Sequence, residues 1–183
     1  MSTIKTLAER LRADLTRQAE IEGGTRELLL CQGTWATVVY RMGQWIYEKR
    51  RPPHFIPLKL AYQLVSKAIE VTCGISVPAS VKIGPGLYIG HFGEIIIHSD
   101  AVIGERFSIG QGCTIGTRGQ GGSDVPVIGD NVYLGVGSKV LGGIRIGDNV
   151  AVGANAVVVK DVPDDCIAVG VPAKVLPRKG AGR

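Results

Sequence analysis

The sequence predicts a mainly β fold: a parallel β-helix of six-residue repeats, preceded by a small α-helical region. From Val77 onward a branched aliphatic residue returns every six positions, as in "VYLGVGSKVLGGIRIGDNVAVGANAVVV" at 132–159, usually followed by glycine or another small residue. A helix requires apolar residues three or four positions apart and a flat strand two apart, so neither explains a period of six. Composition agrees, because 45% of the residues are hydrophobic but only 5% are aromatic, which suits thin aliphatic layers.

Charge and cysteine content narrow the function classes. The net charge of +5 comes without a basic face interleaved with aromatic residues, so we expect no nucleic-acid partner. The cysteines lie far apart and form no CxxC pair, which favours reduced packing residues in a cytoplasmic protein. The N-terminus has no apolar signal-peptide core. We predict no membrane span, although an amphipathic helix within 55–75 could contact a membrane surface.

Three helices are expected at the N-terminal end. The first covers 3–21, with Ser2 or Thr3 as a possible cap and leucines recurring at helical spacing. The second covers 25–48 and is broken by "RRPPHFIP", because proline lacks the amide donor. The third covers about 57–72 and ends at Gly74.

The repeats that follow fall into three series, separated by interruptions near 95–97 and at 117–126. Each repeat supplies a short strand with its aliphatic residue pointing inward, and three repeats close a triangular coil. The polar stretch "TRGQGGSDVP" at 117–126 is too long for a corner and should protrude as a loop. We therefore expect a helical region at 1–74, a β-helix at 75–177 and a basic tail at 178–183. The inward positions are Val77, Ile83, Ile89 and Ile95, then Ile97, Ile103, Ile109 and Ile115, then Ile128, Leu134, Val140, Ile146, Val152 and Val158.

The repeats, "GTRGQGG" at 116–122 and "AVGVPAKVL" at 168–176 together resemble the hexapeptide-repeat acyltransferases, in particular the serine acetyltransferase-like branch. The resemblance covers roughly 70–177. It implies a left-handed β-helix, a homotrimer and acetyl-CoA bound in the groove between neighbouring subunits. The N-terminal helices resemble a shortened form of the region through which such trimers can pair.

His91 in "IGHFGE" is the candidate catalytic residue. Acetyl transfer to a hydroxyl group needs a base that is neutral near pH 7, and an imidazole provides one. Its position also matches the "DHATG" histidine of the resembled family, while an ordinary corner residue is the alternative. His98 is a second, weaker candidate, and His54 is assigned a structural role. Only two histidines fall in the repeats, too few for the three-histidine metal site of a gamma-type carbonic anhydrase, so we expect no metal.

The family pattern is not matched everywhere. The resembled enzymes carry aspartates where this chain has Gly90 and Ser76, and an Arg-His pair where it has Asp124 and Val125. Those groups hold the histidine or recognise the amino acid, so we expect a different hydroxyl acceptor, preferably a sugar or polysaccharide precursor. Serine is the alternative acceptor, and a non-catalytic scaffold is a third hypothesis. The predicted substrate-binding positions are Ser76, Gly90, Glu94 and Asp124.

The resemblance also suggests cofactor-binding positions. Corner glycines let backbone amides approach the thioester and pantetheine arm of acetyl-CoA, and lysines suit its phosphates. Plain corner geometry is the alternative explanation for each glycine. The predicted positions are Gly116, Gly135, Val136, Gly153, Ala154, Lys160 and Lys174.

Overall fold

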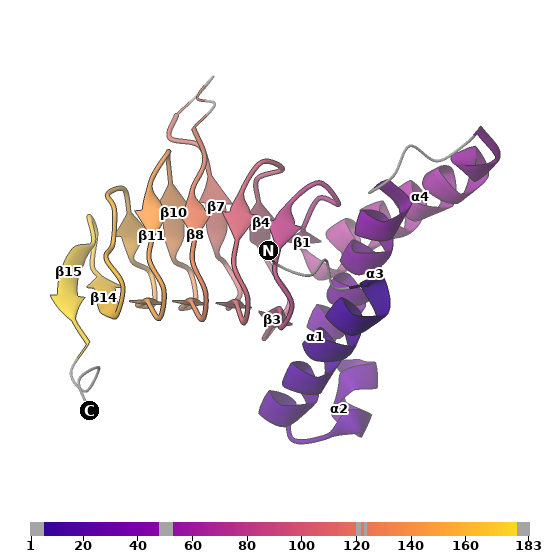
Figure 1. The fold of residues 1–183 in the computed structure, drawn as a ribbon, viewed down its shortest axis with the longest axis horizontal. Coiled ribbons are helices and arrows are strands. Elements are labelled where there is room, and N and C mark those ends of the chain that lie inside the picture. The colour runs from indigo at the N-terminus through magenta and orange to yellow at the C-terminus, as the bar shows by residue number, and fades with distance from the viewer. Residues whose placement is uncertain (1–5, 48–52, 120–121, 123, 179–183) are drawn as a thin grey trace.

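The computed structural model describes residues 6–47, 53–119, 122 and 124–178, and in it a group of helices covers one end of a left-handed parallel β-helix (Figure 1). The predicted fold class is confirmed. The helices end at Cys73 and the first strand begins at Ile75, with Gly74 between them. We refer to the stacked triangular coils from Ile75 onward as the prism.

Helix α1 (Leu7–Glu22) begins with a reciprocal cap. The Thr6 hydroxyl accepts a hydrogen bond from the Glu9 amide, and the Glu9 carboxylate accepts one from the Thr6 amide. The helix ends at Gly23, whose φ of 92° lies in the left-handed region. The start predicted at residue 3, with Ser2 or Thr3 as cap, falls outside the described residues.

The single helix predicted over 25–48 is wrong within the described residues, because the chain forms α2 (Thr25–Leu30) and α3 (Gln32–Tyr47). Cys31 between them is extended, with φ −81° and ψ 117°. The break lets α3 approach the prism closely at Gly33, where a Cβ atom would lie only 2.1 Å from the Ile89 carbonyl oxygen. A short 3-10 turn (η1, Pro53–Phe55) then leads into α4 (Ile56–Cys73).

Helix α4 ends where the sequence predicted, at Gly74, whose φ is 64°. Along the described ranges, no helix combines the length and the hydropathy that crossing a membrane requires. Contact with a membrane surface stays a prediction.

The prism has three sheets, which we label A, B and C, and the strands of successive coils pair in parallel. Sheet A contains β1 (Ile75–Ser76), β4 (Ile95–Ile97), β7 (Thr114–Gly116), β10 (Lys139–Leu141) and β13 (Val157–Val158). Sheet B contains β2 (Lys82–Ile83), β5 (Val102–Ile103), β8 (Val127–Ile128) and β11 (Arg145–Ile146). Sheet C contains β3 (Tyr88–Ile89), β6 (Ser108–Ile109), β9 (Tyr133–Leu134), β12 (Ala151–Val152) and β14 (Cys166–Val169), and β15 (Lys174–Pro177) closes it as an antiparallel strand.

The core is the aliphatic column that the period of six predicted. Every inward position named from the repeats is buried, from Val77 in the first coil to Val158 near the last. Because each short strand buries one such residue, successive coils stack a continuous apolar layer. Between β7 and β8 the chain projects from the prism (Figure 1), where the sequence predicted a loop.

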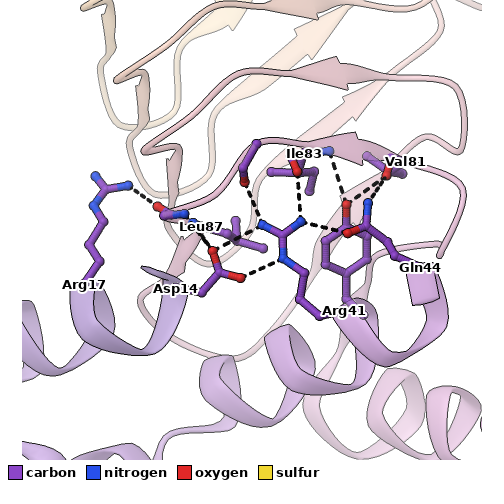
Figure 2. Close-up of polar contacts among 10 residues, drawn as sticks. Asp14, Arg17, Arg41, Gln44, Val81, Ile83 and Leu87 are labelled. Carbon is purple, nitrogen blue, oxygen red and sulfur yellow. Dashed lines mark hydrogen bonds and ion pairs between the residues drawn. The ribbon is translucent and has the colours of Figure 1, made fainter. Parts of the chain in front are cut away.

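The helices do more than cover the base of the prism, because their buried side chains bond to the backbone of its first coil (Figure 2). The Asp14 carboxylate accepts hydrogen bonds from the amides of Gly86 and Leu87, at 2.7 and 2.8 Å. The Arg41 guanidinium donates to the Ile83 carbonyl at 2.8 Å and pairs with Asp14 at 2.7 Å, both side chains being fully buried. Backbone groups that would be unpaired at the end of a β-helix are thereby satisfied.

Candidate active site

His91 lies on an enlarged corner of the first coil, where the chain passes from sheet C to sheet A. Between the paired residues of β3 and β4 this corner contains residues 90–95, whereas the corner above it, between β6 and β7, contains only 110–113. The two additional residues leave both His91 and Phe92 exposed, the latter 57% exposed. We refer to residues 90–95 as the His91 corner.

Of the predicted substrate-binding residues, Gly90 and Glu94 belong to this corner and Ser76 lies close to it. Glu94 is exposed and has a φ of 53°, a left-handed conformation that is uncommon for a residue with a long side chain. Ser76 lies one strand below, on β1, and lines a cavity of about 430 Å³ between β1, α3 and α4. Tyr40, Tyr62 and Glu70 also line that cavity.

Gly90, directly before His91, packs against residues that the sequence analysis did not select. A Cβ atom at this position would lie 3.3 Å from the Tyr88 hydroxyl oxygen. That hydroxyl donates a 2.9 Å hydrogen bond to Glu22 at the end of α1, and burial together with this carboxylate raises the pKa of Tyr88. The corner therefore has a carboxylate close by, supplied by a helix.

The helical region also fixes the backbone that leads into the corner. The Gln18 amide donates to the Ile89 carbonyl at 3.2 Å, and the Cys31 thiol lies 3.9 Å from the Gly90 carbonyl. Gly33 adds the close contact with Ile89 described above. His91, the predicted general base, thus follows a segment of backbone that is held by α1 and by the junction of α2 and α3.

The predicted cofactor positions divide between separate parts of the prism. Gly135, Val136, Gly153 and Ala154 occupy later corners between sheets C and A, on the same edge as His91. Gly116 and Lys160 lie on the edge between sheets A and B, and Lys174 begins β15 on sheet C.

Packing explains some of these glycines and leaves one unexplained. A Cβ atom at Gly135 would lie 2.8 Å from the Ala154 amide nitrogen, and one at Gly153 would lie 2.8 Å from the Val169 side chain. At Gly116 a Cβ atom would meet nothing within 4 Å among the described residues. Gly116 is itself buried, and the described residues leave open the position that a Cβ atom would take.

Asp124 is not brought to His91 within one chain. A Cβ atom at Gly143 would lie 2.7 Å from the Asp124 Cβ, which places Asp124 beside the corner between sheets A and B. His98 lies on the same edge, where its Nδ1 accepts a hydrogen bond from the Asp100 amide at 3.2 Å. His91 and Asp124 therefore lie on different edges of the prism.

Sequence reasoning missed Glu22 and Tyr88 because the residues that they contact are distant along the chain. The enlarged corner did leave a signal: the interruption of the period near 95–97 reflects its two additional residues. Among the described residues, no group of three histidine, cysteine or acidic side chains has the arrangement of a metal site.

Comparison with known proteins identifies the family. Residues 126–160 match the family described as Bacterial transferase hexapeptide (six repeats). The chain is 37% identical over 177 residues to the serine acetyltransferase of Synechococcus elongatus, an alignment that covers 96% of this chain and 70% of that protein. It is 32% identical over 167 residues to the enzyme of Escherichia coli K12, with 91% of this chain and 59% of that protein covered.

Solved structures agree with these matches. The serine acetyltransferase of Brucella abortus in complex with coenzyme A has a TM-score of 0.82 and 25% identity, over 94% of this chain and 68% of that one. The Neisseria gonorrhoeae enzyme in complex with serine has a TM-score of 0.78 and 30% identity, over 93% of this chain and 69% of that one. The predicted enzyme class, an acyltransferase, is confirmed with the family. By sequence and by fold, the chain belongs to the serine acetyltransferase family of hexapeptide-repeat transferases.

Proposed function

We propose that this chain is an acetyl-CoA-dependent O-acetyltransferase that acetylates the hydroxyl group of serine. The observation that carries the proposal is the match to a protein named serine acetyltransferase over 96% of the chain, helical region included. Related structures contain coenzyme A or serine, which supports the donor and the acceptor. The chain spans 59% of the Escherichia coli relative, so substrates and partners are inferred and need direct measurement.

In the proposed mechanism His91 acts as general base. Its neutral imidazole accepts the proton of the acceptor hydroxyl while that oxygen attacks the thioester carbonyl carbon, forming the ester C–O bond. As the C–S bond breaks, the imidazolium returns the proton to the coenzyme A sulfur, so His91 ends the cycle neutral. The exposure of His91 on an enlarged corner supports this role, because substrates can approach the ring.

A sugar or polysaccharide hydroxyl is the second candidate acceptor and was the one preferred from the sequence. Gly90, Ser76 and Asp124 stand where the resembled enzymes have charged residues for serine, and this difference favours another acceptor. The comparisons give no support to a polysaccharide substrate, and their names and bound ligands favour serine.

The deciding experiment is release of free coenzyme A from acetyl-CoA with L-serine and with a panel of sugar hydroxyl acceptors. We expect kcat/KM for L-serine to exceed that for every sugar in the panel. Turnover of a sugar with no serine turnover would overturn the serine assignment. The variants Ser76→Asp and Gly90→Asp restore the charges of the resembled family, and a large gain in serine turnover from either would indicate a weakened serine enzyme.

A further inference from the structure

A cavity at the base of the prism has no part in the proposed mechanism. It lies between β1, α3 and α4 and has a volume of about 430 Å³. Pockets that bind small molecules commonly have volumes of a few hundred Å³, so this one is large enough for a ligand. Among the described residues that line it, only Ser76 belongs to the candidate active site.

The space exists because two helices meet closely at one point and carry small side chains elsewhere. At Gly43 a Cβ atom would overlap the Tyr62 ring, so α3 and α4 touch there. The Tyr62 ring also packs edge to face on Tyr47, with the ring centroids 5.7 Å apart. Where the prism core has isoleucine and valine, the walls of the cavity carry several small side chains. These small lining residues are Ala36, Ser66, Ser76, Ala79 and Ser80.

Most of the apolar lining comes from α3 and from the chain at β1. Tyr40 offers its ring rather than its hydroxyl, because that hydroxyl donates to the Val81 carbonyl at 2.8 Å and accepts from the Ile83 amide at 3.2 Å. A ligand in the cavity therefore meets an aromatic ring and an aliphatic surface on this side. The other apolar lining residues here are Ala36, Val39, Ile75, Val77 and Pro78.

Helix α4 supplies polar groups to the same cavity. Gln63, Ser66 and Glu70 are spaced by three and four positions, so they lie along one face of the helix. The Gln63 amide nitrogen donates to the Tyr47 hydroxyl at 3.4 Å, and within the described chain the amide oxygen accepts no hydrogen bond. Glu70 pairs with Lys67 through Oε2 at 2.9 Å, which leaves Oε1 to accept from a ligand.

This lining suits a neutral ligand that carries hydroxyl groups. Among the described lining residues Glu70 has the only charged side chain, and no lysine or arginine is present to bind a phosphate or a carboxylate. Serine hydroxyls and the glutamine amide both donate and accept hydrogen bonds, as alcohols do. A sugar ring has an apolar C–H face that packs on aromatic side chains and an edge of hydroxyl groups, so it matches both sides of the cavity.

We propose that this cavity binds a neutral sugar ring, with its C–H face toward Tyr40 and its hydroxyl groups bonded to Gln63, Ser66 and Glu70. The site goes beyond the proposed function, because binding here needs neither acetyl-CoA nor His91. A free sugar and a sugar unit of a longer glycan share this chemistry. Comparing monosaccharides with disaccharides distinguishes these two sources, since a glycan site binds the disaccharide more tightly.

The test is binding of the methyl glycosides of glucose, galactose and N-acetylglucosamine to the full chain, followed by saturation-transfer NMR and calorimetry. We expect at least one glycoside to bind the wild type with a dissociation constant of about 1 mM, the affinity typical of a ligand with so few atoms. Ser66→Leu fills the cavity and should abolish detectable binding. Gln63→Met keeps the length of the side chain but removes its hydrogen bonds, and should raise the dissociation constant about 2- to 10-fold.

Ala68→Leu is the matched control, because it adds a leucine side chain at an exposed position of the same helix, two residues from Ser66. It should bind the glycoside as the wild type does. Thermal unfolding of each variant separates loss of fold from loss of binding. If Ser66→Leu does not fold, Gln63→Met still decides the outcome, since unchanged affinity in that variant contradicts the proposal.

Three results would overturn the sugar site. The first is that no glycoside of the panel binds the folded wild type. The second is equal binding by Ser66→Leu and Ala68→Leu, which would place the sugar elsewhere. The third is displacement of the sugar by L-serine or loss of binding in His91→Ala, which would place it at the His91 corner. None of these results changes the turnover of L-serine, so the proposed function is tested separately.

Discussion

The role of His91 is defined by what surrounds it. The residue is exposed on the enlarged corner, which also contains Glu94, and the Tyr88 hydroxyl lies close to the preceding Gly90. His98, by contrast, uses Nδ1 locally to accept from the Asp100 amide. One nitrogen of the His98 ring is therefore occupied within its own turn.

Replacing His91 by alanine should lower kcat by roughly 10² to 10⁴, because general-base catalysis acts mainly in the transition state. Affinity for acetyl-CoA should stay nearly unchanged. Steady-state kinetics and titration with coenzyme A measure the two effects separately, and His98→Ala serves as the control with a much smaller loss. Equal turnover by the wild type and His91→Ala would refute the assigned base.

At the same scale, the buried pair of Asp14 and Arg41 stabilises the junction of helices and prism. Replacing Arg41 by methionine leaves a fully buried carboxylate without its counter-charge, which costs about 3–5 kcal/mol of unfolding free energy. Lys67→Ala breaks the ion pair between Lys67 and Glu70, whose side chains are 67% and 43% exposed, respectively. This change should lower the free energy of unfolding by less than about 1 kcal/mol. Urea denaturation of both variants measures the difference, and similar losses would contradict this account.

Between elements, the decisive contact is that of α3 with β3. Gly33 approaches the Ile89 carbonyl so closely that any side chain must push the helix away. Helix α3 begins directly after the extended Cys31, whose thiol lies 3.9 Å from the Gly90 carbonyl oxygen. The helical region is therefore in direct contact with the strand that leads into the His91 corner.

Gly33→Ala should destabilise the fold by about 1–3 kcal/mol, the usual cost of overpacking, and should also lower kcat. Gly122→Ala is the stability control, because its Cβ would meet neighbouring atoms at 3.4 Å or more. Denaturant unfolding and kinetics of both variants test the coupling. If Gly33→Ala has the same free energy of unfolding as the wild type, α3 can move away from Ile89 at no energetic cost, and the expected coupling is wrong.

Sequence reasoning succeeds where a structural rule repeats along the chain. Each coil buries one aliphatic residue per strand, so the period of six in the sequence predicted both the prism and its inward positions. The break at Cys31 leaves no such trace in the sequence, because it accompanies a close approach of Gly33 to Ile89, a residue of the prism that is distant along the chain. The local sequence pattern therefore predicted the repeats but not the end of α2, which lies beside the tertiary contact between Gly33 and Ile89.

The candidate site divides in the same way. His91 was selected because its residue type and its motif both suit a base. Glu22 was missed because it meets Tyr88 across 66 positions of sequence, a distance over which no local pattern operates. Gly116 was selected by resemblance, and within the described part of the chain no atom lies where its Cβ would be.

For the molecule as a whole, the separation of site residues predicts assembly. His91 lies on the edge between sheets C and A, whereas Gly116 and Asp124 lie on the edge between sheets A and B. Aliphatic side chains such as Ile96 and Val127 are exposed on the outer faces of sheets A and B, at 53% and 45%. Packing of neighbouring prisms would bury these side chains and bring the two edges together.

We therefore expect a homotrimer to be the smallest active unit. Light scattering at micromolar concentration should give three times the chain mass of 19.4 kDa, or a multiple of that assembly. Activity should fall on dilution if trimers dissociate, since we expect each site to draw residues from two chains. A monodisperse monomer with full activity would contradict this expectation.

The helices that cover the first coil of the prism affect the order in which the protein can fold during translation. During synthesis the N-terminal helices leave the ribosome before any strand does, and N-terminal units generally fold first. Asp14 and Arg41 then offer paired donors and acceptors to the first coil as it emerges, and that coil offers its upper edge to the second. Each coil would therefore be wound onto a finished surface in the order of translation. The lower edges of β2 and β3 would then be covered by the helices before another nascent chain could join them.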